Sequence, residues 1–153
     1  METGPARIRP GRADDAPALA RLCTELGYPS TEEQMAGRLR LLGHVEHCLF
    51  VAEAPAGAEP GGGPVLLGVI DVHTRVVLEE DPFAELIALV VTADAQGEGV
   101  GSALVAEAVH WARARGLSKM WVRVSLWREA TPRFYESLGF TLYKEQRVFE
   151  LAL

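Results

Sequence analysis

Several residue types are scarce or missing in this sequence, and each absence narrows the class of protein. The chain of 153 residues contains no asparagine, two cysteines, and only two lysines among its fifteen basic residues. Cys23 and Cys48 lie far apart without CxxC spacing, which predicts neither a disulfide framework nor a zinc site. No apolar run reaches the ~18 residues of a membrane-spanning helix, and the first residues lack the pattern of a signal peptide. We therefore expect a cytoplasmic protein without a metal ion and without a membrane contact.

Positive charge is also scarce. The formal net charge is −6, and the sequence contains no basic run. Because the phosphate backbone of a nucleic acid requires a positive patch, we expect no nucleic-acid partner. An excess of acidic residues can instead attract a cationic amine. The abundance of alanine, glycine and proline, with arginine in place of lysine, is typical of a GC-rich, bacterial genome.

The length and the hydrophobic pattern predict one domain over residues 1–153. Helical periodicity follows Asp14 or Asp15 as far as residue 26, begins again at Thr31, and recurs over residues 99–115 and 130–138. Strand-like runs cover residues 6–9, 48–54, 65–77, 84–92, 119–126, 140–143 and 147–151. The order β-α-α-β-β-β-α-β-α-β-β predicts an α/β (α+β) domain with a mixed sheet. Residues 55–64, rich in proline and glycine, predict a hairpin loop rather than a domain linker.

The strongest local signal is a glycine-rich loop between an apolar strand and a helix. Gly97, Gly99 and Gly101 lack side chains, so a bulky anion can approach the backbone closely. The first turn of a helix adds free N–H groups and the positive end of the helix dipole, which together favour a diphosphate group. The GxxxxGK[ST] pattern is missing, and Ser102 stands where the dinucleotide pattern GxGxxG needs glycine. A glycine-rich helix start that serves only close packing stays open as the alternative.

The residues of this loop resemble a known family. Gln96-Gly97-Glu98-Gly99-Val100-Gly101 is similar to the Q/R-x-x-G-x-G/A motif of the GNAT superfamily of N-acetyltransferases. Downstream, Arg133-Phe134-Tyr135-Glu136-Ser137-Leu138-Gly139-Phe140 resembles the family's FYxxxGF segment, and the spacing and order of the two motifs also match. The resemblance implies a mixed, mostly antiparallel central sheet of about seven strands flanked by four helices.

The same resemblance implies an acetyl-CoA site at the loop. Main-chain N–H groups over residues 97–102 would hold the diphosphate, with Gln96 as a neutral donor where relatives often have arginine. Main-chain groups of the preceding strand would bond the pantetheine arm and the thioester. Arg128 stands where relatives often have asparagine, and it could contact the arm, a phosphate or the substrate. The residues assigned to acetyl-CoA are Leu89, Val90, Val91, Gln96, Gly97, Glu98, Gly99, Val100, Gly101, Ser102 and Arg128.

Forming an amide from a thioester also requires an acid for the departing thiolate. Tyr135 matches the tyrosine that the family uses for this purpose. A phenol with an ordinary pKa, near ~10, stays protonated at neutral pH and can donate. A tyrosine that only packs behind the last helix is the plain alternative.

The base that deprotonates the amine is less clearly marked in the sequence. Many relatives carry a glutamate at the position that is Ile87 in this chain. Glu85 lies two residues earlier and, by strict alternation, would share a strand face with Ile87, Leu89 and Val91. His73, which shares a face with Asp71, is the second candidate, because an imidazole ordinarily titrates near neutrality. A solvated strand end or a satisfied polar neighbour is the alternative for each.

The expected partner is a small-molecule amine, which acidic residues such as Glu79, Glu80 and Asp81 could attract. Acetylation of a protein N-terminus, a non-catalytic acyl-CoA-binding regulatory module and a nucleotide-binding domain stay open. An exposed edge strand near the C-terminus could pair with a second copy, giving a homodimer with contacts from Trp121, Trp127 or Phe149.

Overall fold

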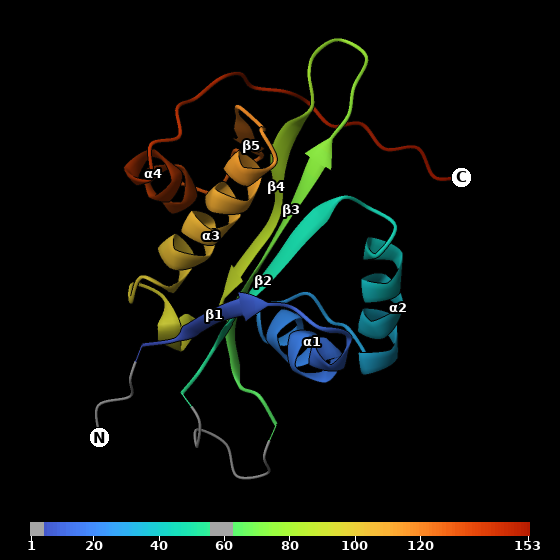
Figure 1. Cartoon of the computed structure of the whole chain (residues 1–153), viewed down its shortest axis with the longest axis vertical. Helices are drawn as coiled ribbons and strands as arrows, with labels where there is room; N and C mark the ends of the chain where they lie inside the picture. Colours follow the sequence, from blue (N-terminus) through green and yellow to red (C-terminus); the bar gives the residue numbers. More distant parts are fainter. Residues whose placement is uncertain (1–4, 56–62) are drawn as a thin grey trace. The chain divides into compact units, whose positions relative to one another are not determined.

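A computed structural model describes residues 5–55 and 63–153 (Figure 1). The chain forms two units, Met1–Arg123 and Val124–Leu153, and each is described by itself. Most of the hairpin loop that the sequence predicts over residues 55–64 lies outside the described residues.

The first unit is built on a mixed sheet of five strands in the order β1-β2-β3-β4-β5. Their bounds are β1 (Arg7–Pro10), β2 (His47–Glu53), β3 (Leu66–Arg75), β4 (Phe83–Val91) and β5 (Met120–Val122). Strands β1 to β4 pair antiparallel, and β5 pairs parallel to β4. The prediction of a mixed, mostly antiparallel sheet is confirmed, but the prediction of about seven strands is wrong.

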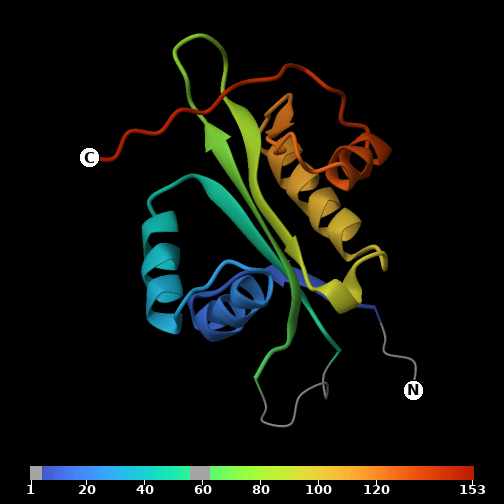
Figure 2. The same ribbon diagram turned by 180° about the vertical axis from the view of Figure 1, so that it is seen from behind.

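Helices cover both faces of this sheet (Figures 1 and 2). On one face lie α1 (Ala16–Glu25) and α2 (Glu32–Leu42), and Leu19 and Leu22 of α1 join Val51 and Val69 in one buried cluster. On the other face α3 (Val100–Ala114) packs so closely on β3 that a Cβ at Gly68 would lie 3.1 Å from Leu104. Because neighbouring strand residues point to opposite faces, the contacts of residues 68 and 69 place α3 opposite α1.

A buried ion cluster joins the start of the chain to the sheet. The guanidinium of Arg9 on β1 donates to both carboxylate oxygens of Asp15, at 2.9 and 2.8 Å, and also pairs with Glu53 on β2. The main-chain N–H of Arg12 donates to Asp15 at 2.7 Å. Burial opposes the charged form of Asp15, but the bonds from Arg9 and Arg12 outweigh it and hold the pKa of Asp15 below its ordinary value. The short 3₁₀ helix η1 (Ala13–Asp15) is thereby fixed against β1 and β2.

The second unit contains α4 (Ala130–Ser137), which completes the four predicted helices. The described residues of this unit include no strand, so the predicted strands over residues 140–143 and 147–151 are wrong. The predicted strand over residues 119–126 is shortened to β5. A β-prone sequence becomes a strand only where a neighbouring strand offers hydrogen-bonding partners in register. Several of the apolar side chains that predicted these strands are instead exposed: Leu142, Val148, Phe149 and Leu151.

Candidate active site

The glycine loop follows the end of β4 and leads into α3. After Val91 the chain forms the 3₁₀ helix η2 (Ala93–Ala95), and Gly99 is the residue before the first turn of α3. Gly97 and Gly99 have φ values of +80° and +85°, a region that costs other residues ~1–2 kcal/mol. A Cβ built at either residue would meet no atom within 4 Å, so close packing is not the reason for these two glycines. The loop therefore leaves open space beside the amides that begin α3, where an anion can bind.

The end of β4 separates from β5 just before this loop. The two strands pair only through Ala84, Glu85 and Leu86 of β4. The N–H of Thr92 donates to the Leu67 oxygen at 2.8 Å, toward β3. Main-chain groups alternate in direction along a strand, so those of Val90 also face β3 while those of Leu89 and Val91 face the side that β5 has left. Of the three strand residues assigned to acetyl-CoA, two thus present main-chain groups to this gap.

Gln96 makes a contact that the sequence does not predict. Its side-chain Nε2 donates to the main-chain oxygen of Val91 at 3.1 Å. The side chain thus bridges the glycine loop and the last residue of β4. The sequence assigns Gln96 to the diphosphate and Val91 to the arm; in the structure the two residues bond one another.

A β-bulge interrupts β4 at Ile87. Asp71 of β3 pairs with Ala88 and Val72 pairs with Leu86, so Ile87 is the extra residue. Glu85, which pairs with His73, therefore shares a face with Ala88 and Val90. The expectation that Glu85 shares a face with Ile87, Leu89 and Val91 is wrong, because the bulge reverses the alternation on which it depended.

Glu85 is held at the centre of an arginine clamp. The side chain is 7 % exposed, and each carboxylate oxygen meets a guanidinium. Arg123 Nε donates to Oε1 at 2.7 Å, and Arg75 Nε lies 3.3 Å from Oε2. Arg75 ends β3 and Arg123 follows β5, so Glu85 joins three neighbouring strands at the end where β4 and β5 still pair.

Beside this clamp, Asp71 and His73 form a half-buried pair on β3. His73 Nε2 and Asp71 Oδ2 lie 2.8 Å apart, with side-chain exposures of 16 % and 13 %. The second oxygen of Asp71, Oδ1, is buried and has no hydrogen-bond partner among the described residues. Burial raises the pKa of Asp71, and the nearby His73 and His47 partly offset this rise. His47 on β2 contacts the His73 ring edge-on, with centroids 5.9 Å apart.

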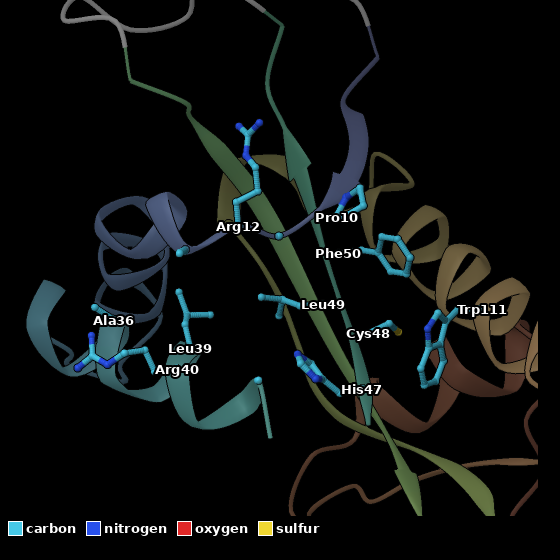
Figure 3. A pocket seen from close by; sticks show the side chains of 13 residues that line it. Pro10, Arg12, Ala36, Leu39, Arg40, His47, Cys48, Leu49, Phe50 and Trp111 are labelled. Carbon is cyan, nitrogen blue, oxygen red and sulfur yellow. The ribbon is translucent and has the colours of Figure 1, made fainter. Parts of the chain in front are cut away.

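His47 is also one of the residues that line a cavity of about 620 Å³ (Figure 3). Its lining includes Leu39 and Arg40 of α2, Cys48 of β2 and Trp111 of α3. Burial, and secondarily the charge of Asp71, raises the pKa of Cys48 to about 12, so this thiol is protonated at neutral pH. None of the residues that the sequence assigns to acetyl-CoA or catalysis lines the cavity, although His47 touches both the cavity and the Asp71–His73 pair.

In the second unit, Tyr135 lies on α4 and is 7 % exposed. Its ring makes edge-on contacts with Phe134 and Phe140, at centroid distances of 5.1 and 5.4 Å. Burial raises the pKa of Tyr135, and the positive charge of Arg128 opposes this rise in part. The phenol is therefore protonated at neutral pH. The Arg128 guanidinium itself lies 4.8 Å from the centroid of the Trp127 ring.

Comparison with known proteins decides the family. A family model described as the acetyltransferase (GNAT) family matches residues 18–140, which include both the glycine loop and Tyr135. The chain belongs to the GNAT family of acetyltransferases. It is 34 % identical over 90 residues to a mycothiol acetyltransferase of Thermobispora bispora, covering 57 % of this chain and 30 % of that protein. It is 32 % identical over 84 residues to an uncharacterized N-acetyltransferase of Methanocaldococcus jannaschii, covering 54 % of this chain and 36 % of that protein. The chain thus matches about a third of the length of these curated relatives.

Solved structures share the GNAT fold. The aminoglycoside N-acetyltransferase AAC(6')-Iy in complex with CoA has a TM-score of 0.82 at 16 % identity, with 100 % of this chain and 99 % of that chain covered. The aminoglycoside 6'-N-acetyltransferase AAC(6')-Ih of Acinetobacter baumannii has a TM-score of 0.79 at 17 % identity, covering 97 % and 99 %. At these identities the likeness concerns the fold.

Two further findings concern metal ions and membrane-spanning helices in this GNAT chain. In the described part of the chain, no group of three or more His, Cys, Asp or Glu side chains is arranged to hold a metal ion. Among the same residues, we find no helix with the length and apolar character that a bilayer span requires.

The sequence did not reveal the partners of the candidate bases. Arg75, Arg123 and His47 come into contact with Glu85 and His73 only through cross-strand register. The spacing of Asp71 and His73, two residues apart on one strand, did predict that their side chains share a face. Their hydrogen bond shows that the two side chains also interact.

Proposed function

We propose that this GNAT chain is an N-acetyltransferase that moves an acetyl group from acetyl-CoA to a primary amine of a small molecule. One observation carries the proposal: a loop with two left-handed glycines begins α3 directly beside the half of β4 that β5 leaves unpaired. The loop suits a diphosphate, and the main-chain groups of Leu89 and Val91 on the side that β5 has left suit an extended arm with amide groups. An arm that bonds the Val91 oxygen would replace or share its hydrogen bond with Gln96.

The proposed reaction is a direct attack of the amine on the thioester. Once the protonated amine has given one proton to a base, its nitrogen forms a bond to the carbonyl carbon through a tetrahedral intermediate. The carbon–sulfur bond then breaks, the thiolate takes a proton from Tyr135, and the proton lost by the nitrogen restores the phenol. The raised pKa of Tyr135 supports its role as the acid. Glu85 and His73 are the two candidate bases. Residues 96–102 and Arg128 are proposed to bind acetyl-CoA.

Two findings support a small-molecule acceptor. The solved relatives include enzymes named for aminoglycosides, and a curated relative is named for mycothiol. Acidic residues at the turn between β3 and β4 also suit a cation, although Glu80 is already paired with Lys119, which leaves Glu79 and Asp81 as the stronger candidates. A cytoplasmic location and a homodimer remain parts of the proposal.

The test is thiol release from acetyl-CoA in the presence of neamine, spermidine, glucosamine, tyramine and a hexapeptide with a free N-terminus. We expect release with at least one small amine, and the acetylated product in the mass spectrum. Release with the hexapeptide alone would indicate N-terminal acetylation. Binding of acetyl-CoA in calorimetry without release would indicate a regulatory module. Thermal stabilisation by ATP or NAD but not by CoA would contradict the donor assignment.

A further inference from the structure

We propose that Asp71 and His73 are the proton-accepting pair of this site: His73 takes the proton of the amine, and Asp71 positions the imidazole. The proposal rests on the proposed N-acetyltransferase function. It assigns to Glu85 a different task, which is to join β3, β4 and the end of β5.

The hydrogen bond between the two side chains defines which ring nitrogen can accept. When Asp71 is ionised it can only accept, so neutral His73 donates its Nε2–H to Oδ2 across the 2.8 Å contact. The lone pair then lies on Nδ1, and no hydrogen bond joins Nδ1 to any residue that the structure describes. A carboxylate that fixes the imidazole tautomer and stabilises the imidazolium is an established arrangement for a base.

Glu85 lacks this freedom. Both of its oxygens are engaged by guanidinium groups, at 2.7 and 3.3 Å, and the residue is buried. A proton from the amine could reach either oxygen only by displacing a guanidinium group. Removal of the Glu85 charge would leave Arg75 and Arg123 without their anion.

The pair also lies within reach of the unpaired part of β4. Asp71 is opposite Ala88 on β4, next to the bulge at Ile87, and the neighbouring Ile70 is opposite Leu89. His73 is three residues from Ile70, which is about 10 Å along an extended strand. A relay of about three hydrogen-bonded water molecules, spaced ~2.8 Å apart, would span such a distance. The amine therefore passes its proton through water to His73 Nδ1, and His73 later releases it to solvent.

Charged and titratable groups face His73 from three strands. On its own strand it faces Asp71, on β2 it faces His47, and on β4 it pairs with Glu85, whose charge Arg75 and Arg123 balance. Two carboxylates therefore lie beside the His73 imidazole, those of Asp71 and Glu85. Among the described residues, Glu85 has guanidinium partners and Asp71 has none. Removing the charge of Asp71 should make the imidazolium less stable.

The experiment compares His73→Asn, Asp71→Asn and Glu85→Gln with wild type, using the best amine of the panel above and acetyl-CoA from pH 5.5 to 9.5. His110→Gln, a change of an exposed histidine on α3, is the matched control. We expect His73→Asn to lower kcat/KM by about 10²–10⁴-fold and to abolish the acid limb of its pH profile. Asp71→Asn should move that limb to lower pH. His110→Gln should leave the position of the limb unchanged. Glu85→Gln leaves Arg75 and Arg123 unbalanced beside His73, so it should move the limb to lower pH without abolishing it. The titration of the amine itself is common to all variants and cancels in this comparison.

A second measurement reads the tautomer without a substrate. In ¹⁵N-histidine-labelled protein, the His73 signals are identified by their loss in His73→Asn. At a pH above the acid limb, we expect His73 to carry its proton on Nε2 in wild type. A proton on Nδ1 would mean that Asp71 is the protonated partner, and this would overturn the proposal.

The two proposals fail in different ways. If wild type releases no thiol with any amine, the proposed function is wrong and the proton-accepting pair falls with it. If wild type is active but His73→Asn keeps the acid limb, or Glu85→Gln abolishes it, only the assignment of the pair is overturned.

Discussion

Burial can prepare a single residue for acid catalysis, which is the role that we propose for Tyr135. The aromatic contacts with Phe134 and Phe140 exclude water from the ring, and this burial raises the pKa of the phenol. An acid of this kind is protonated at every pH at which the protein is expected to work. A thiol is ordinarily more acidic than a phenol, so transfer of this proton to the departing thiolate is uphill, and it is completed when the proton lost by the nitrogen restores the phenol.

The first prediction concerns this phenol. Tyr135→Phe keeps the ring and its packing but removes the proton, so we expect kcat to fall by about 10²-fold or more, with little change in the Kd of acetyl-CoA. Steady-state kinetics and calorimetry measure the two quantities. An unchanged kcat at saturating substrate would remove Tyr135 from the chemistry and leave it as a packing residue.

At the scale of elements, the glycine loop and α3 depend on two left-handed residues. An alanine at Gly97 or Gly99 has the space for its methyl group but is forced into an unfavourable φ. We therefore expect Gly97→Ala and Gly99→Ala to distort the loop and raise the KM for acetyl-CoA by about tenfold, the equivalent of ~1.4 kcal/mol.

Gly116, just beyond α3, provides the matched control for this second prediction. It has φ of +75° and equally open surroundings, so Gly116→Ala introduces the same strain away from the loop. Both kinds of variant should lose similar thermal stability, but only the loop variants should bind acetyl-CoA more weakly in calorimetry. Equal loss of affinity in Gly116→Ala would show that general destabilisation, and not the loop, is being measured.

Elements also show where sequence reasoning succeeds and fails. The apolar run before the loop and the periodicity of α3 are local signals, so β4, the loop and α3 were predictable. The bulge at Ile87 depends on the register between β3 and β4, which no local pattern contains. One inserted residue reverses the faces of the strand, so Glu85 points away from the face on which the sequence placed it. The predicted C-terminal strands are wrong for a related reason. Alternating apolar residues indicate that a segment could form a strand, but they do not indicate which strand it would pair with.

At the scale of the whole molecule, the exposed apolar side chains of the last residues suggest self-association. Leu142, Val148, Phe149 and Leu151 are between 79 % and 88 % exposed, and Trp127 is 76 % exposed. Monomeric proteins rarely leave such groups of large apolar residues in water. The third prediction is that the chain is a dimer in solution and that Phe149→Glu with Leu151→Glu makes it monomeric. Light scattering coupled to size exclusion measures the mass, and a monomeric wild type would contradict the prediction.

The pH dependence of folding is the second property of the whole molecule, and two aspartates affect it in opposite directions. The pKa of Asp15 is lower in the folded state, so its contribution to stability is present above the unfolded value of ~3.9 and is lost as the pH falls through the folded pKa. The pKa of Asp71 is higher in the folded state, so its contribution is present below ~3.9 and is lost as the pH rises through the folded pKa.

The fourth prediction follows from these signs. Asp15→Asn leaves Arg9 buried with only Glu53 as an anion, and we expect it to cost about 3–5 kcal/mol at neutral pH, with the loss shrinking toward pH 3. Asp71→Asn should instead become more stable relative to wild type as the pH rises from 4 to 7, because it removes a charge that burial disfavours. Urea denaturation across this range measures both differences. If Asp71→Asn moves the acid limb of the pH profile but does not weaken folding at pH 7, the Asp71 carboxylate serves the reaction. If Asp71→Asn instead loses more stability relative to wild type at pH 7 than at pH 4, the carboxylate serves the fold.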